Sequence, residues 1–235
     1  MSDLVRYSLL TKKMPREFIL LQGTGCIWKR CTFCDYYLDV AEDPFTVNRP
    51  VIERVTGELG VLDVINSGSA MELDAKTLSF LRQTIERLGI HTVWFEAHWL
   101  YHRKLKAFAE KFPGVTVKFR TGVETFDPKL RKEWGKGIPE EIRAQTIADY
   151  FSGICLLIGI KGQTKQSILR DIKLALEYFE YFSVNAFVEN TTNMKRDQEL
   201  IDWFVQTVFP DLKDHPNVDI LINNTDLGVG AKNWN

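Results

Sequence analysis

The chain has 235 residues, 45% of them hydrophobic, which is enough to bury a full core in a single domain over residues 1–235. Its 30 basic residues nearly balance 31 acidic ones, so we expect no nucleic-acid partner, because phosphate binding gains from excess lysine and arginine. No apolar run approaches the roughly 20 residues that span a bilayer, and the N-terminus lacks a signal-peptide core. The sequence therefore predicts a soluble, cytoplasmic protein with no membrane partner.

Short apolar strands alternate with amphipathic helices along the chain. The predicted strands are 18–21, 61–65, 92–95, 115–119, 154–160, 184–188 and 218–222. Helical spacing of apolar residues follows over 78–88, after a cap at Thr164 and after a cap at Asp197. This alternation implies parallel βαβ units. The α/β fold is predicted to be a partial (β/α) barrel of about six or seven parallel strands, with a doubly wound open sheet as the alternative.

Polar side chains follow the predicted strands, at the rim where a parallel barrel carries its active site. They are Ser67, Glu96, Arg120, Glu124, Glu189, Asn190 and Asp226. The alternative is that these residues are polar only because loops face water. The longest stretch without a periodic pattern, 35–50, is predicted to be irregular and to cover the site.

Three of the four cysteines, Cys26, Cys31 and Cys34, lie within nine residues directly after the first predicted strand. Clustered thiolates repel one another unless a metal neutralises them, so the C-x4-C-x2-C spacing predicts a metal site. An odd set of clustered thiols in a cytoplasmic chain argues against disulfides. The fourth cysteine, Cys155, falls inside an apolar predicted strand and is expected to be an inert core thiol.

Zinc and an iron–sulfur cluster are the two metal centres to weigh. A structural zinc site needs four ligands, and Cys155 and the histidines are far from the cysteine loop in sequence. Three thiolates leave one iron of a [4Fe–4S] cluster without a protein ligand, which suits chemistry more than electron transfer alone. The cluster is favoured, while a non-enzymatic metal-binding module remains the distant alternative.

The cysteine loop resembles the cluster motif of the radical S-adenosylmethionine (SAM) superfamily, which usually reads C-x3-C-x-aromatic-C. Phe33 precedes the last cysteine as in that motif, whereas the spacing between Cys26 and Cys31 has one extra residue. The resemblance implies a [4Fe–4S] cluster, SAM as the second cofactor and an electron donor such as a flavodoxin or ferredoxin. It further implies that a 5′-deoxyadenosyl radical removes a hydrogen atom from the substrate.

The same resemblance implies residues that contact SAM. The motif's aromatic residue would pack near the adenine, and backbone just after the last cysteine would contact the adenine amino group. A glycine-rich turn after the second predicted strand would receive the methionine amino group, since glycine permits close backbone approach. Residues after the third and fourth predicted strands would hold the ribose and, through an arginine fork, the methionine carboxylate. In this order the candidates are Phe33, Tyr36, Ser67-Gly68-Ser69, Glu96 and Arg120.

Three further runs, 65–72, 94–99 and 119–125, resemble the compact queuine lyases of this superfamily. That resemblance implies cleavage of the side-chain carbon–nitrogen bond of queuine, with release of 7-aminomethyl-7-deazaguanine after hydrogen abstraction. The chain lacks cysteines for a second cluster and an extra domain for a macromolecule, so a small-molecule substrate is favoured. Another small heterocycle, such as a pterin or a deazapurine precursor, is the alternative.

The residue types can be matched to such a base. A guanine-like face presents N–H donors, which suit a carboxylate, and each donor buried without a partner costs about 1–3 kcal/mol. An amide adds a further contact, and aromatic side chains stack on the ring. The substrate-binding candidates are Glu124, Glu189, Asp226, Asn185, His98 and Trp28, each with a purely structural role as the alternative.

Overall fold

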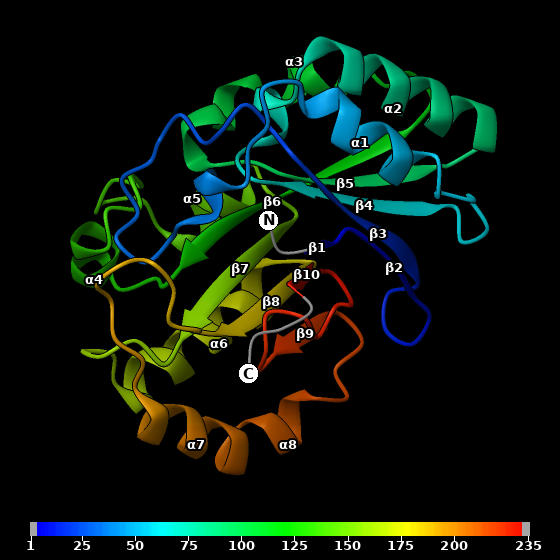
Figure 1. Ribbon diagram of the computed structural model, residues 1–235. Helices are drawn as coiled ribbons and strands as arrows, with labels where there is room; N and C mark the ends of the chain where they lie inside the picture. The colour runs from blue at the N-terminus through cyan, green and yellow to red at the C-terminus, as the bar shows by residue number, and fades with distance from the viewer. Residues whose placement is uncertain (1–3, 232–235) are drawn as a thin grey trace. The chain divides into compact units, whose positions relative to one another are not determined.

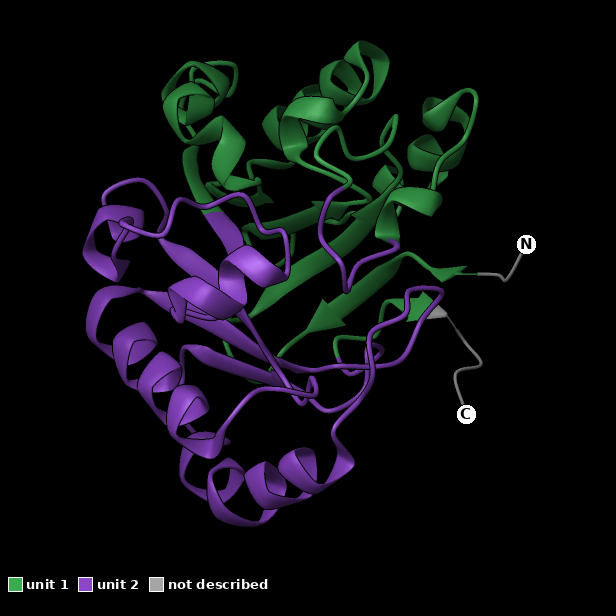
Figure 2. Cartoon of the chain, turned by 90° about the vertical axis from the view of Figure 1, so that its left-hand side faces the viewer, with its two compact units in different colours: residues 1–29, 36–119, 227–235 green, residues 30–35, 120–226 purple. Residues whose placement is uncertain are grey.

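The computed structural model describes residues 4–231, which divide into two compact units (Figures 1 and 2). Unit 1 comprises residues 4–29, 36–119 and 227–231 of the described chain, and unit 2 comprises 30–35 and 120–226. The cysteine loop is shared between the units, because its first cysteine belongs to unit 1 and the other two to unit 2. Within residues 4–231 no helix has the length and apolar character needed to cross a membrane. A single domain over 1–235 and a cytoplasmic location stay predictions.

Unit 1 is built on strands that pair in chain order. They are β2 (Tyr7–Leu10), β3 (Arg16–Leu21), β4 (Val61–Asn66), β5 (Thr92–Glu96) and the start of β6 (Thr116–Glu124). Strand β2 is antiparallel to β3, whereas β3, β4 and β5 pair in parallel. A separate antiparallel pair, β1 (Leu4–Val5) with β10 (Gly230–Ala231), brings the two ends of the described chain side by side.

The helices of unit 1 connect these strands, and α1 and α2 pack on one another beside β3 (Figure 1). In chain order they are η1 (Tyr36–Leu38), α1 (Pro44–Ile52), η2 (Ala70–Glu72), α2 (Ala75–Leu88), η3 (Trp99–Lys104) and α3 (Leu105–Ala109). Gly89 ends α2 in the left-handed conformation at φ 65°, as a C-terminal glycine does.

The irregular stretch predicted over 35–50 is wrong, because α1 occupies much of it. Pro44 suits the first turn of α1, where the missing N–H has no helical partner anyway. Pro50 lies inside the same helix. A proline inside a helix normally ends the helical pattern, so the sequence pattern did not predict α1.

Unit 2 continues from β6 with three parallel strands, β7 (Gly153–Ile158), β8 (Tyr181–Ala186) and β9 (Val218–Leu221). Its helices are α4 (Pro128–Glu133), α5 (Ala144–Ala148), α6 (Lys165–Tyr178), α7 (Gln198–Thr207) and α8 (Phe209–Leu212). The predicted caps are confirmed: Thr164 accepts a hydrogen bond from Ser167 N–H, and Asp197 accepts one from Leu200 N–H. The predicted parallel α/β pattern is therefore present in both units, and β2 was the strand of the main sheet that the sequence did not reveal.

A buried ion pair connects β3 and β4, the first two parallel strands of unit 1. Arg16 Nε donates to Asp63 Oδ2 at 2.9 Å, and both side chains are fully buried. We expect Asp63→Asn to lower the free energy of unfolding by about 3–5 kcal/mol, because the guanidinium would stay buried without its counter-charge. Denaturant unfolding measures this loss. The matched control is Glu53→Gln in the exposed Arg49–Glu53 pair, expected to cost at most about 1 kcal/mol; equal losses would contradict the expectation.

Candidate functional site

In unit 1 the carboxylate of Glu72 ties the glycine-rich turn to the first cysteine. Its Oε2 accepts from Ser69 N–H at 2.7 Å, and its Oε1 accepts from Ile27 N–H at 3.1 Å and from the Tyr101 hydroxyl at 2.9 Å. Burial raises the pKa of Tyr101, and the hydrogen bond to Glu72 raises it further, so this hydroxyl remains a donor. Because Ile27 directly follows Cys26, Glu72 fixes the backbone at that end of the cysteine loop.

Gly68 allows this arrangement because it has no side chain. A Cβ at position 68 would overlap Glu72 Oε2 and would lie 3.2 Å from Cys26 Cα. Next to it, Ser67 Oγ accepts from Gly23 N–H at 2.9 Å. The turn after β4 and the loop after β3 therefore approach each other at backbone distance, which is the property expected of a glycine-rich cofactor turn.

An unsatisfied acceptor lies at the same turn. Asn66 donates its amide N–H to Ser69 O at 3.2 Å, while Asn66 Oδ1 is buried and has no hydrogen-bond partner among the described residues. A buried polar atom without a partner costs about 1–3 kcal/mol. An ammonium donor of a ligand would satisfy it, so the turn fits the methionine amino group that the resemblance to radical SAM enzymes implies for Ser67, Gly68 and Ser69.

Two predicted substrate contacts of unit 1 lie against each other. The rings of Trp28 and His98 stack with centroids 5.1 Å apart and an interplanar angle of 24°. The backbone N–H of His98 donates to Ser69 Oγ at 3.0 Å, and its Nδ1 accepts from Leu100 N–H. This places the stacked pair beside the glycine-rich turn. Of the other unit 1 candidates, Glu96 ends β5 half-buried, whereas Tyr36 is exposed in η1.

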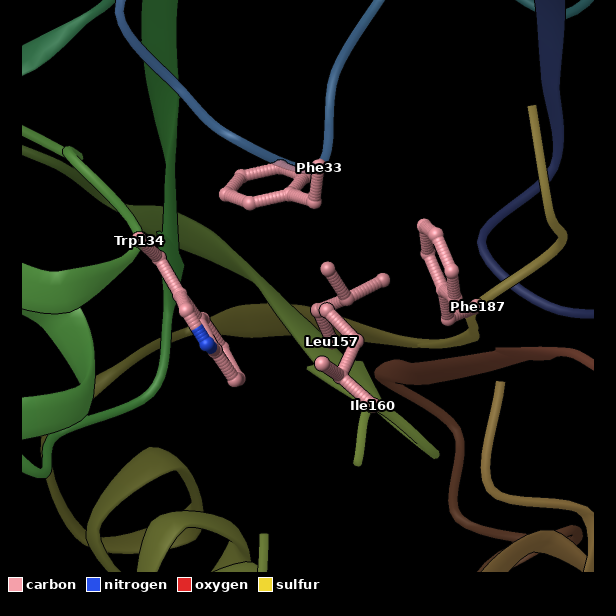
Figure 3. Packing of buried hydrophobic residues seen from close by; sticks show 5 residues of the cluster. All are labelled: Phe33, Trp134, Leu157, Ile160 and Phe187. Atoms are coloured by element: carbon pink, nitrogen blue, oxygen red, sulfur yellow. The ribbon is translucent and has the colours of Figure 1, made fainter. Parts of the chain in front are cut away.

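In unit 2 the second half of the cysteine loop packs on an apolar cluster. Figure 3 shows the ring of Phe33 above Leu157, with the rings of Trp134 and Phe187 on either side. The half-buried side chains of Cys31 and Cys34 also pack against this cluster. The apolar surroundings exclude water from the buried ring of Phe33.

Backbone contacts hold this part of the loop in place. Thr32 N–H donates to the Trp134 carbonyl at 3.0 Å, and Asn190 Nδ2 donates to the Phe33 carbonyl at 2.8 Å. Gly135, at φ 66°, follows Trp134, and a Cβ there would overlap the Arg30 carbonyl. Thus Asn190, which the sequence placed at the rim after β8, supports the loop.

Beside the two cysteines lies a buried ion pair between Lys136 Nζ and Glu124 Oε1 at 2.8 Å. Both residues are 8% exposed. Glu124 has φ 66°, a strained conformation for a non-glycine residue, at a bulge of β6. The next residues are held by Asp171, which accepts from the Thr125 hydroxyl and from Phe126 N–H. Burial raises the pKa of Asp171 to about 6.

Arg120 and Asn185 occupy strand positions in unit 2. Arg120 lies inside β6 and not after it, is 3% exposed, and has its guanidinium carbon 5.9 Å from the centroid of the Tyr181 ring. The sequence missed this because 120–122 resembles a turn, whereas β6 continues through its bulge to Glu124. Asn185 pairs with Leu157 of the neighbouring strand, and its buried Oδ1 has no hydrogen-bond partner among the described residues.

The two remaining carboxylate candidates are exposed and bonded within their own loops. Glu189 accepts from Arg196 N–H and pairs with Lys195, and the backbone hydrogen bond from Arg196 lowers the pKa of Glu189. Asp226 accepts from the N–H groups of Ile222 and Asn223 in a turn. These contacts give both carboxylates the structural role that the sequence left open, and substrate binding by them stays a prediction.

The residues fit an iron–sulfur cluster by the chemistry of their donor atoms. Among residues 4–231 no three histidine, cysteine or acidic side chains are gathered into a ready metal site. Cys31 and Cys34 nevertheless present soft sulfur ligands beside a buried cation, Lys136, and thiolates are the ligands of such clusters. Cys155 lies in β7 as predicted but is half-buried instead of a core thiol.

Sequence reasoning missed three residues of this arrangement. Glu72 carried a usable signal, since Ser69 and Glu72 match the S-x-x-E pattern of a capping box. Tyr101 and Lys136 carried none, because the fold brings them to partners 29 and 12 residues away, at no spacing typical of a motif.

Comparison with solved structures finds a queuine lyase from Clostridium spiroforme bound to SAM and queuine. It is 39% identical, with a TM-score of 0.92 over 97% of this chain and 100% of that one. No family model matches the chain, and no curated protein matches it. The predicted partial (β/α) barrel is confirmed, and with its three-cysteine loop it defines a radical SAM enzyme. The chain belongs to the queuine lyase family within that class.

Proposed function

We propose that this protein is a queuine lyase that cleaves the side-chain carbon–nitrogen bond of queuine and releases 7-aminomethyl-7-deazaguanine for salvage. The observation that carries the proposal is the 39% identity over nearly the whole chain to a lyase bound to SAM and queuine. The cysteine loop supports the same chemistry. The [4Fe–4S] cluster and SAM, when bound, would supply a 5′-deoxyadenosyl radical, which in the proposed reaction would remove a hydrogen atom from the cyclopentenediol of queuine.

The cluster would be held by Cys26, Cys31 and Cys34, which stand in one short loop of the chain. SAM would be held by residues from several parts of the chain, each suited to one group of the cofactor. The turn with Asn66 and Gly68 offers an acceptor and close backbone approach to the methionine ammonium. The other proposed contacts are Ser67 and Ser69 for that ammonium, Arg120 for the methionine carboxylate, Glu96 for the ribose, and Phe33 and Tyr36 for the adenine.

Each unit by itself offers candidate contacts for the base of queuine: buried polar atoms in unit 2 and an aromatic pair in unit 1. Asn185 Oδ1 is a buried acceptor without a partner among the described residues, so an N–H donor of the base would satisfy it. Glu124 has a second carboxylate oxygen besides the one that Lys136 binds. Trp28 and His98 present a stacked aromatic surface for the ring. A flavodoxin or ferredoxin would supply the electron, in the cytoplasm.

The test is anaerobic incubation of cluster-loaded protein with a reductant, SAM and queuine. We expect 5′-deoxyadenosine and 7-aminomethyl-7-deazaguanine to form, and neither to form when SAM is omitted. 5′-Deoxyadenosine without the deazaguanine would overturn the assigned reaction. A parallel panel of pterins and deazapurine precursors identifies a different heterocyclic substrate, and metal analysis showing zinc without iron would instead support a metal-binding module.

A further inference from the structure

Lys136, the cation of the buried Lys136–Glu124 pair, has no role in the chemistry assigned so far. Lys136 Nζ is 2.8 Å from Glu124 Oε1 and 5.8 Å from the centroid of the Phe33 ring. Phe33 stands between Cys31 and Cys34 in the loop, so this cation lies against the segment that carries two of the three cysteines. A buried charge is little screened by solvent and acts strongly on its neighbours.

An unfavourable backbone conformation at Glu124 places this ion pair. Glu124 has φ 66° although it is not glycine, and strain of this kind costs of order 1–3 kcal/mol. A Cβ on Gly122 would overlap Glu124 Oε1 and lie 2.7 Å from Lys136 Nζ. On the other side, Gly135 makes room for the Arg30 carbonyl. The strained backbone at Glu124 and the missing side chains at Gly122 and Gly135 thus allow the ion pair and the cysteine loop to lie close together.

Lys136 keeps its positive charge at this position. Its Nζ is 2.8 Å from the Glu124 carboxylate, and an opposite charge at this distance favours the charged form of a buried lysine. In this ion pair Lys136 is a positive charge held in place beside the loop. The chemistry it offers to the loop is therefore electrostatic.

We propose that Lys136 is a positioning residue that acts through its charge: it raises the reduction potential of the cluster held by Cys31 and Cys34, and Glu124 limits that rise. Reduction adds negative charge to a cluster, so a nearby cation stabilises the reduced state and a nearby anion destabilises it. The proposal rests on the proposed function only in requiring a cluster on these cysteines. It assigns the ion pair a role before substrate binds.

The experiment is a reduction-potential titration of anaerobically loaded full-length protein, followed by the electron paramagnetic resonance signal, without SAM or queuine. Lys136→Met removes the charge at similar volume, and we expect a lower potential than in the unaltered protein. Glu124→Gln removes the counter-charge, and we expect a higher potential. The matched control is Lys132→Met, from α4, which ends before Lys136; Lys132 is in an exposed pair with Glu140, and we expect an unchanged potential.

Opposite shifts in the two variants distinguish a charge effect from a structural one, since loss of packing would move both potentials the same way. An unchanged potential in Lys136→Met, or shifts of the same sign, would overturn the proposal. If Lys136→Met loads no cluster, Lys136→Arg must load it at near the original potential and Glu124→Gln must still shift it upward. Unaltered protein that binds no iron would instead overturn the proposed function, so the two failures are distinguishable.

Discussion

Replacement of Cys31 by alanine is expected to abolish both iron binding and the formation of 5′-deoxyadenosine. The same result is expected for Cys26→Ala and Cys34→Ala. In the proposed site three thiolates would hold a cluster whose fourth iron is open, and removal of one would leave two irons without a protein ligand. Iron per protein after anaerobic loading measures the first loss, and chromatography of the reaction mixture measures the second.

The control for this prediction is the fourth cysteine. Cys155 lies in β7, where its register partners are Gly122 and Ser183, and it is not part of the cysteine loop. Cys155→Ala should therefore bind iron as the unaltered protein does. A Cys155→Ala protein without iron, or a Cys26→Ala protein with a full cluster, would show that the ligand set is wrong.

Gly68→Ala is expected to weaken SAM binding at least about tenfold. The added Cβ would meet Glu72 Oε2, so this carboxylate would have to give up its hydrogen bonds to Ser69 and Ile27. If the turn must regain one of these hydrogen bonds to bind SAM, binding is weakened by about 1.5–3 kcal/mol, and 1.4 kcal/mol is a factor of ten in a binding constant. Equilibrium dialysis of radiolabelled SAM against cluster-loaded protein measures the change.

Two further variants delimit this effect. Gly114→Ala strains the backbone locally, because Gly114 has φ 79°, but its Cβ would meet nothing within 4 Å, so it should leave SAM binding unchanged. Tyr101→Phe removes one of the three donors to Glu72 and should weaken SAM binding less than Gly68→Ala does. SAM affinity in Gly68→Ala equal to that of the Gly114→Ala control would refute the close approach as a requirement for binding.

Local sequence signals predicted the elements of the fold well. The caps at Thr164 and Asp197 are confirmed, because each depends on hydrogen bonds within a few residues. These sequence signals failed at two places where the structure departs from a local sequence rule. Helix α1 contains Pro50, and β6 continues past a segment that resembles a turn.

The cysteine loop could be recognised from the sequence because its three cysteines lie within nine residues of one another. Phe33 within the loop indicated the class of enzyme. The sequence alone thus determined the metal-binding motif, the alternation of strands and helices, and the superfamily. Only the tertiary structure decided that Glu72 and Tyr101 secure the first cysteine, and that Lys136 is buried against the segment with the other two. The reason is physical: a hydrogen bond or charge interaction depends on distance in space, and residues brought together from far apart along a chain leave no periodic pattern in it.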